Sequence, residues 1–206
     1  MKLKDEEKYD RLITAAVTVL ATGGLASFST TKVAKLAGIP QSNVYIYFAN
    51  KQSLLEAVYQ TTVHQQSVAV ADALDAQASL VTQLQASVTA LYEFSREFPE
   101  TVTAIQVLLD DVALKHQLQL KQDDAANQRI QRLLQVGVAQ QLLRAVDLNF
   151  IRYFLARPVY HYAAGVRSGL YPDTPQALAD LTAMIMGAVL QPAAYRAWLA
   201  QDQSGQ

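Results

Sequence analysis

A short run of polar and aromatic side chains in the first quarter of the chain offers groups that can read duplex DNA. Gln41 and Asn43 carry paired donor and acceptor groups that match the edge of an adenine. Ser42 can bond to a base or to a phosphate. Tyr45 and Tyr47 offer hydroxyl groups to phosphate oxygens and flat rings to sugars and thymine methyl groups. These residue types and their spacing indicate a nucleic-acid contact.

The residues before this run predict a short helix that ends at a glycine. Ser29 or Thr30 can cap its first free backbone N–H groups with a hydroxyl oxygen. Gly38 is predicted to end the helix, because glycine adopts the left-handed conformation at little cost. Four apolar residues at helical spacing form the stripe that should face the core: Val33, Ala34, Leu36 and Ala37.

A second short helix is predicted to carry the polar run. Pro40 fits its first turn, where a backbone N–H is not needed. Ile39, Val44 and Phe48 can face inward, which leaves the polar side chains outward or half-outward. Helix, glycine turn and helix form the helix-turn-helix pattern, whose second helix enters the DNA major groove. The alternative is that the tyrosines are core aromatics and the polar residues are a solvated helix face.

The start of the next helix supplies a phosphate site. Asn50 is a good N-cap, and it places Lys51 and free N–H groups at the positive end of that helix. With the threonines that lead the first short helix, this completes the predicted DNA-binding set: Thr30, Thr31, Gln41, Ser42, Asn43, Tyr45, Tyr47 and Lys51.

The charge distribution agrees with such a contact. The whole chain has a formal net charge of −1. Residues 1–51 hold seven Lys and Arg against four Asp and Glu, a net of +3, which leaves −4 for residues 52–206. No acidic residue lies between Arg11 and Glu56. This local excess of positive charge is what phosphate contact requires.

In these motifs the chain resembles the tetracycline-repressor (TetR) family of bacterial transcription regulators. The resemblance covers residues 8–58, and two positions depart from the family pattern. Pro40 replaces a Ser-type residue, so the side-chain cap of the second helix is lost, and Ser42 stands where glycine is common. The matching motifs are Ala15-Ala16, Gly23-Gly24, Thr30-Thr31, Val33-Ala34, Ala37-Gly38-Ile39-Pro40, Val44-Tyr45-Ile46-Tyr47-Phe48 and Lys51-Gln52-Ser53-Leu54.

The periodicity along the whole chain predicts an all-α fold. A helix-turn-helix domain over residues 1–49 precedes a larger helical domain over residues 50–206 for effector binding and dimerisation. The helix of residues 50–75 connects the two. No strand-like alternation stands out. Other helices are expected over residues 4–21, 78–98, 102–112, 130–138, 147–165 and 174–199, the last two kinked at Pro158 and Pro192.

Composition excludes several classes of protein. The chain has no cysteine, which rules out disulfides and thiolate chemistry. Its apolar residues make up 51% of the sequence, but no uninterrupted run reaches the length of a membrane span. The charged N-terminus does not form a signal-peptide core. A cytoplasmic protein without membrane association is therefore expected.

Enzymatic chemistry is the alternative from a different class. Asp110-Asp111 with His116 could form a metal or acid/base site. The pair is interpreted instead as a solvated helix end, because two carboxylates and a distant histidine carry little motif information. A third reading is a DNA-binding activator without a ligand. No cofactor, metal ligand or catalytic residue is predicted.

The resemblance implies a ligand-responsive repressor that binds a palindromic operator as a homodimer. Its dimer interface would lie on the helices of residues 147–165 and 174–199. An unknown small, largely apolar effector would bind between about Thr61 and Tyr162, in a cavity that aromatic and polar side chains can line. The candidates are Tyr92, Phe98, His116 and Tyr153.

Overall fold

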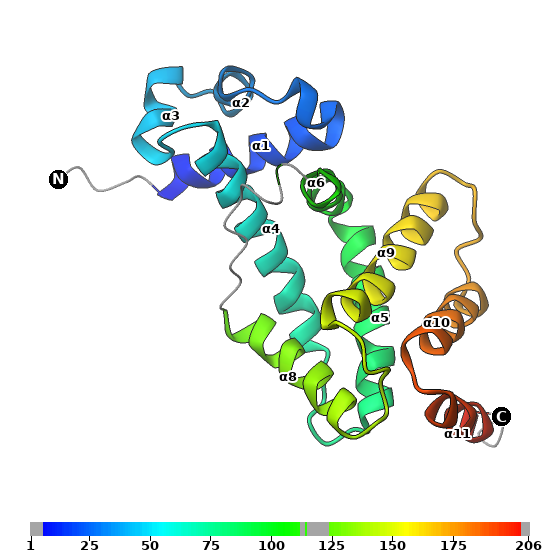
Figure 1. The fold of residues 1–206 in the computed structure, drawn as a ribbon. Coiled ribbons are helices and arrows are strands. Elements are labelled where there is room, and N and C mark those ends of the chain that lie inside the picture. Colours follow the sequence, from blue (N-terminus) through cyan, green and yellow to red (C-terminus); the bar gives the residue numbers. More distant parts are fainter. Residues whose placement is uncertain (1–5, 112–113, 115–123, 203–206) are drawn as a thin grey trace. The chain divides into compact units, whose positions relative to one another are not determined.

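The computed structural model describes residues 6–111, 114 and 124–202, and every element among them is a helix (Figure 1). The all-α prediction is confirmed. The elements are α1 (Glu6–Ser27), α2 (Thr30–Ala37), α3 (Gln41–Tyr47), α4 (Lys51–Asp72), α5 (Leu80–Glu97), α6 (Pro99–Asp110), α8 (Ala125–Ala139), α9 (Leu148–Arg167), α10 (Pro175–Val189) and α11 (Pro192–Asp202).

Contacts divide the described residues into two compact units. The first takes its residues from 1–65 and 98–122, and the second from 66–97 and 123–206. The helix-turn-helix segment therefore shares its unit with α6, which comes from later in the chain. The proposed functional division between residues 1–49 and 50–206 stays a prediction.

The first unit is built on α1, which packs against α2 and α6. Leu12 and Leu20 of α1 are fully buried, together with Val33 of α2 and Leu54 of α4. The helix predicted over residues 4–21 is longer in the structure, where α1 extends to Ser27 across an interruption. Only Gly24 leaves the helical conformation, with φ 63° and ψ −176°, and the chain resumes helical geometry up to Ser27.

The apolar stripe of α2 has three members and not four. Val33, Ala34 and Ala37 are buried, but Leu36 is 53% exposed, so the prediction for Leu36 is wrong. At about 100° per residue, Leu36 lies roughly 100° around the helix from the centre of the buried stripe.

The second unit is organised around α9, which packs against α5, α8 and α10. The loop between α9 and α10 packs against α9. Tyr162 donates a hydrogen bond from its hydroxyl to the Pro172 carbonyl at 2.7 Å. Tyr171 lies directly over Gly165, where an added Cβ would come within 2.1 Å of its ring. Only glycine permits this approach.

The end of the chain departs from the predicted single kinked helix. Helix α10 ends at Val189, and α11 begins at Pro192. Between them the backbone pairs with residues before α9: Arg144 N–H donates to the Val189 carbonyl at 3.0 Å, and Gln191 N–H donates to Leu142 at 2.9 Å. This pairing holds Leu190 in an extended conformation (φ −76°, ψ 150°), which breaks the helix before the proline. No helix within the described ranges is long and apolar enough to span a membrane.

Candidate nucleic-acid interface

The turn between α2 and α3 has the predicted local chemistry. The Ser29 hydroxyl accepts a hydrogen bond from the Lys32 N–H at 3.2 Å and so caps α2. Gly38 ends α2 in the left-handed conformation, with φ 64° and ψ 36°. Pro40 lies one residue before the place predicted for it: it is the N-cap of α3, whose first residue is Gln41. As its side chain requires, it makes no capping hydrogen bond.

Arg11 of α1 contacts the carbonyl groups of this turn. Its Nη2 donates to the carbonyl of Ala37 at 2.5 Å and lies 3.5 Å from that of Gly38. A positive charge at these carbonyls also complements the negative C-terminal end of α2. Arg11 thus fixes the end of α2, and through it the direction in which α3 begins.

Replacing Arg11 by methionine should loosen this turn and keep most of the packing of the side-chain stem. We expect the free energy of unfolding to fall by about 1–2 kcal/mol, since the lost hydrogen bond is only partly shielded from water. Urea denaturation measures the change. Arg132→Met, at an exposed position of α8, is the matched control and should leave stability unchanged. Equal midpoints for the two variants would show that Arg11 does not brace the turn.

The side chains of α3 divide into a buried face and an outward face. Val44 is fully buried, whereas Gln41 and Ser42 are exposed and Tyr45 is 52% exposed. Asn43 and Tyr47 are half-buried. The outward orientation predicted for the polar run is therefore confirmed.

The two tyrosines of α3 have different surroundings. Tyr47 packs in an aromatic cluster, with its ring centroid 6.3 Å from that of Tyr9 and 6.4 Å from that of Phe48. Its ring therefore helps to anchor α3 on α1. Tyr45 stands mostly in solvent, so the core-aromatic alternative does not describe it.

The start of α4 carries a reciprocal cap. The Ser53 N–H donates to Asn50 Oδ1 at 2.9 Å, and the Asn50 N–H donates to Ser53 Oγ at 3.1 Å. Lys51 is the first residue of the helix and is exposed. Its Nζ lies 5.6 Å from the centroid of the buried Phe28 ring. This contact positions the ammonium group at a positive helix end.

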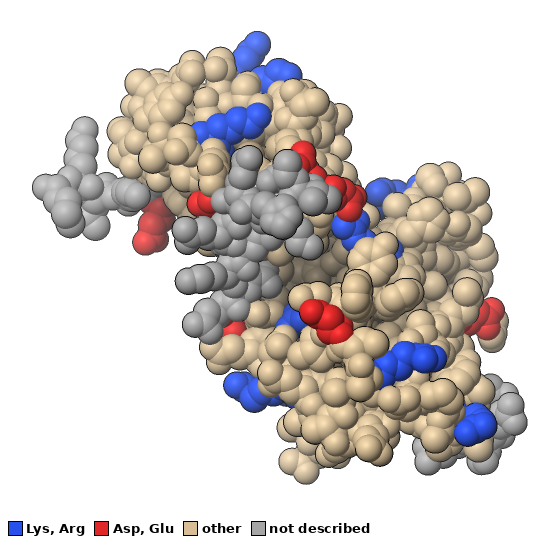
Figure 2. Space-filling view, in the orientation of Figure 1, with Lys and Arg blue, Asp and Glu red and all other residues tan. Residues whose placement is uncertain are grey.

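The remaining predicted contacts lie at the start of α2. Thr30 is half-buried and Thr31 is exposed. Exposed Lys32 and Lys35 follow on the same helix. Figure 2 shows Lys and Arg side chains on the surface of the first unit, at the top of the view. All eight predicted side chains thus belong to one unit and come from α2, α3 and the start of α4.

Residues 12–58 match the family model of bacterial regulatory proteins of the tetR family, a segment that includes all eight of these side chains. The fold agrees along nearly the whole chain. A solved TetR family transcription regulator from Marinobacter aquaeolei VT8 superimposes with a TM-score of 0.76 and 23% identity, and covers 93% of this chain and 100% of its own. In residues 12–58 and in its fold, the chain is therefore similar to members of the tetR family.

Two further likenesses concern regulators of fatty acid metabolism. The fatty acid metabolism regulator protein of Bacillus subtilis (strain 168) is 36% identical over 58 residues, which are 28% of this chain and 30% of that relative. The fatty acid degradation regulator FadR from Bacillus halodurans shares the fold, with a TM-score of 0.64 and 20% identity over 89% of this chain and 97% of its own. The chain spans less than a third of the length of the curated relative.

The predicted effector-binding residues do not share one environment. Tyr92 is buried at 3% exposure, whereas Tyr153 is 55% exposed and Phe98 is 42% exposed. His116 lies outside the described residues. Tyr92 donates a hydrogen bond to Asp173 Oδ1 at 2.6 Å, and its ring lies 5.4 Å from that of Tyr162. Burial, followed by the nearby Asp173 carboxylate, raises the pKa of the Tyr92 hydroxyl far above its usual range.

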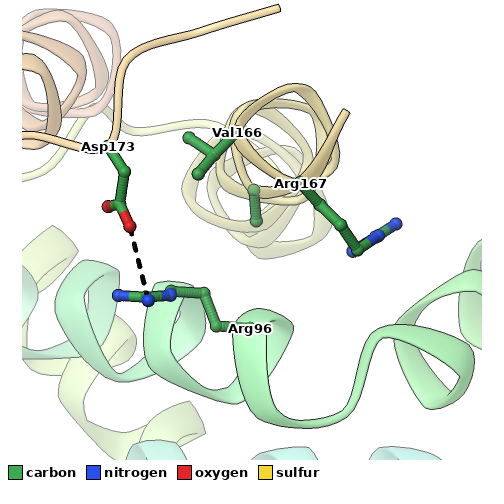
Figure 3. Close-up of a pocket in the computed structure, with 5 residues that line it drawn as sticks. Arg96, Val166, Arg167 and Asp173 are labelled. Carbon is green, nitrogen blue, oxygen red and sulfur yellow. Dashed lines mark ion pairs between the residues drawn. The ribbon is translucent and has the colours of Figure 1, made fainter. Parts of the chain in front are cut away.

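A pocket of about 210 Å³ adjoins this pair in the second unit (Figure 3). Arg96 and Asp173 point toward each other and form an ion pair at 3.3 Å, while Arg167 points away from them. Ala163 and Val166 supply its apolar wall. The volume is below the roughly 300–1,000 Å³ of typical drug-sized ligand sites, so the pocket as it stands admits only a small molecule.

The acidic residues weighed for catalysis lie at the end of α6, where Asp110 is the last helical residue and Asp111 is the C-cap. The Asp111 side chain accepts a hydrogen bond from the Leu114 N–H at 2.8 Å. Among the described residues, no group of three or more His, Asp or Glu side chains could hold a metal ion.

Proposed function

We propose that this protein is a DNA-binding transcription regulator of the tetR family, acting in the cytoplasm as a homodimeric repressor on a palindromic operator. The outward face of α3 carries the proposal. It presents amide and hydroxyl groups on a helix whose start is fixed by Gly38 and Arg11. Lys51 then places a positive charge at the next helix end.

The proposed DNA contacts fall into two classes, contacts to bases and contacts to phosphates. Gln41 and Asn43 contact base edges, where a bidentate pair is worth about 1–3 kcal/mol of discrimination. Thr30, Thr31 and Lys51 bind phosphates and set the position of the protein on the duplex, and the Tyr45 hydroxyl joins them. Fluorescence anisotropy with labelled duplexes tests this directly. Binding that is insensitive to salt and sequence would contradict it.

An apolar face on α9 and α10 supports the homodimer. Phe150, Tyr153 and Phe154 lie at helical spacing on one side of α9 and are 63%, 55% and 46% exposed. On α10, which packs against α9, Met184 is 74% exposed. Large exposed apolar patches mark interaction sites. We propose a second copy as the partner, because one seven-residue helix reads few base pairs and two such helices on a symmetric operator read twice as many.

We further propose that a small, largely apolar effector binds the second unit and lowers operator affinity. The unit is larger than DNA binding requires, and the pocket beside Arg96 combines an apolar wall with charged groups. The names of the two fatty acid regulators above make apolar acids the first compounds to screen. No enzymatic activity forms part of this proposal.

An effector must bind the DNA-free protein more tightly than the operator complex. A tenfold loss of operator affinity corresponds to about 1.4 kcal/mol of coupling, and the operator must weaken effector binding by the same factor. Thermal-shift screening finds the compound, and calorimetric titration of free and operator-bound protein measures the two affinities. Equal affinity for both forms would exclude that compound as an inducer.

A further inference from the structure

Ile46 occupies the most outward part of α3, although the predicted contact set omits it. It is 57% exposed, more than Tyr45 beside it. At about 100° per residue, Ile46 and Ser42 each lie roughly 160° around the helix axis from Val44. Because Val44 is fully buried, these two positions point most directly away from the protein core.

An isolated apolar residue on a surface is ordinary, but the position of Ile46 is not. It is one turn of helix after exposed Ser42 and directly after exposed Tyr45, on the helix whose polar side chains are proposed to contact DNA. When α3 lies in the major groove, the side chain opposite Val44 enters deepest. There it must meet a base edge and cannot form the hydrogen bonds of its neighbours.

Only one apolar group projects into the major groove of DNA, the C5-methyl group of thymine. We propose that Ile46 is a specificity-determining residue that reads a thymine in each half-site through this methyl group. The inference rests on the proposed function, since it requires α3 in the major groove. It adds a contact that selects thymine over cytosine without any hydrogen bond.

The test changes one methyl group at a time. In an operator obtained by selection from random duplexes, each thymine of both half-sites is replaced in turn by deoxyuridine, which lacks only that group. Burial of one methyl-sized group corresponds to about a fourfold change in Kd per half-site, and about fifteenfold for two. We expect one symmetric pair of positions to show this loss with the unchanged protein, measured by fluorescence anisotropy.

Two protein variants test whether Ile46 is the residue that contacts the thymine methyl group. Ile46→Ala should bind the thymine and deoxyuridine operators equally. Leu36→Ala is the matched control, because Leu36 is 53% exposed on the same motif but lies on α2. It should keep the full methyl effect. Circular dichroism should show both variants folded, since neither side chain is buried.

The outcomes separate this inference from the function on which it rests. Specific operator binding with no sensitivity to deoxyuridine at any position would overturn the role of Ile46 and leave the regulator proposal standing. A methyl effect that persists unchanged in Ile46→Ala would also overturn it, because another residue would then read the group. Failure to select any operator would overturn the proposed function and this inference together.

Discussion

Two glutamates placed on the exposed face of α9 and α10, as Phe154→Glu with Met184→Glu, should dissociate the proposed homodimer and abolish tight operator binding. In a symmetric interface each substituted residue occurs twice, so four buried carboxylates would lose their hydration. The affinity gained by linking two binding modules is about 10²–10⁴-fold, and we expect a loss of that order. Sedimentation gives the oligomeric state, and anisotropy gives the affinity.

A matched charge elsewhere controls for nonspecific effects. Val136 on α8 is 46% exposed, as Phe154 is, but lies on neither helix of the proposed interface. Val136→Glu should remain dimeric and bind the operator as the parent does. A double variant that stays dimeric, or a monomer with parental affinity, would show that this face does not join the two copies.

Lys51→Ala should weaken binding to all duplexes alike and reduce the salt dependence of Kd. Each phosphate neutralised by a lysine contributes about 0.9 to the slope of log K against log salt. A dimer loses two such contacts, so the slope should fall by about 1.8. Titrations of the operator and of an unrelated duplex between low and physiological salt measure both effects.

The control for this variant removes a charge far along the chain from the motif. Arg132→Ala takes away one exposed positive charge of α8 and should leave the slope unchanged. If Lys51→Ala keeps the parental slope while the operator is still bound, its ammonium group does not contact phosphate. The cation–π contact with Phe28 would then explain its position.

Local signals predicted the helix-turn-helix motif because its boundaries depend on neighbouring residues. Ser29 caps α2, Gly38 ends it, and Asn50 caps α4, each through hydrogen bonds or backbone angles within a few residues. Arg11 was not foreseen as a brace for the turn. Its bond to Ala37 joins positions 26 residues apart, and no pattern of spacing reveals such a contact.

The exposure of single apolar residues was harder to predict. Leu36 is predicted as a member of the apolar stripe of α2, yet it is 53% exposed, because the buried face of α2 is narrower than the apolar pattern. The break before Pro192 also depends on contacts between residues that are distant in the sequence. A proline predicts either a kink in a helix or the end of one. Here the backbone hydrogen bond from Arg144 to Val189 ends α10 before the proline.

The location of the pocket could not be predicted from local sequence patterns. Tyr92, Phe98 and Tyr153 are amphipathic or aromatic side chains in a region predicted to be helical, and the structure gives them exposures from 3% to 55%. Residue type does not determine which side of a helix a cavity occupies. The pocket residues Arg96 and Asp173 had no sequence signal, because their ion pair joins a helix end to a loop 77 positions later.

Selection of bound sequences from a random duplex pool tests the central claim most directly. The purified protein should enrich an inverted repeat whose half-sites are separated by about one turn of DNA, 10–10.5 base pairs centre to centre, or by a small multiple of it. The two-fold symmetry would report the dimer, and the enriched bases would report what α3 reads. A pool that remains random after repeated rounds, or that yields a single unrepeated site, would contradict the account.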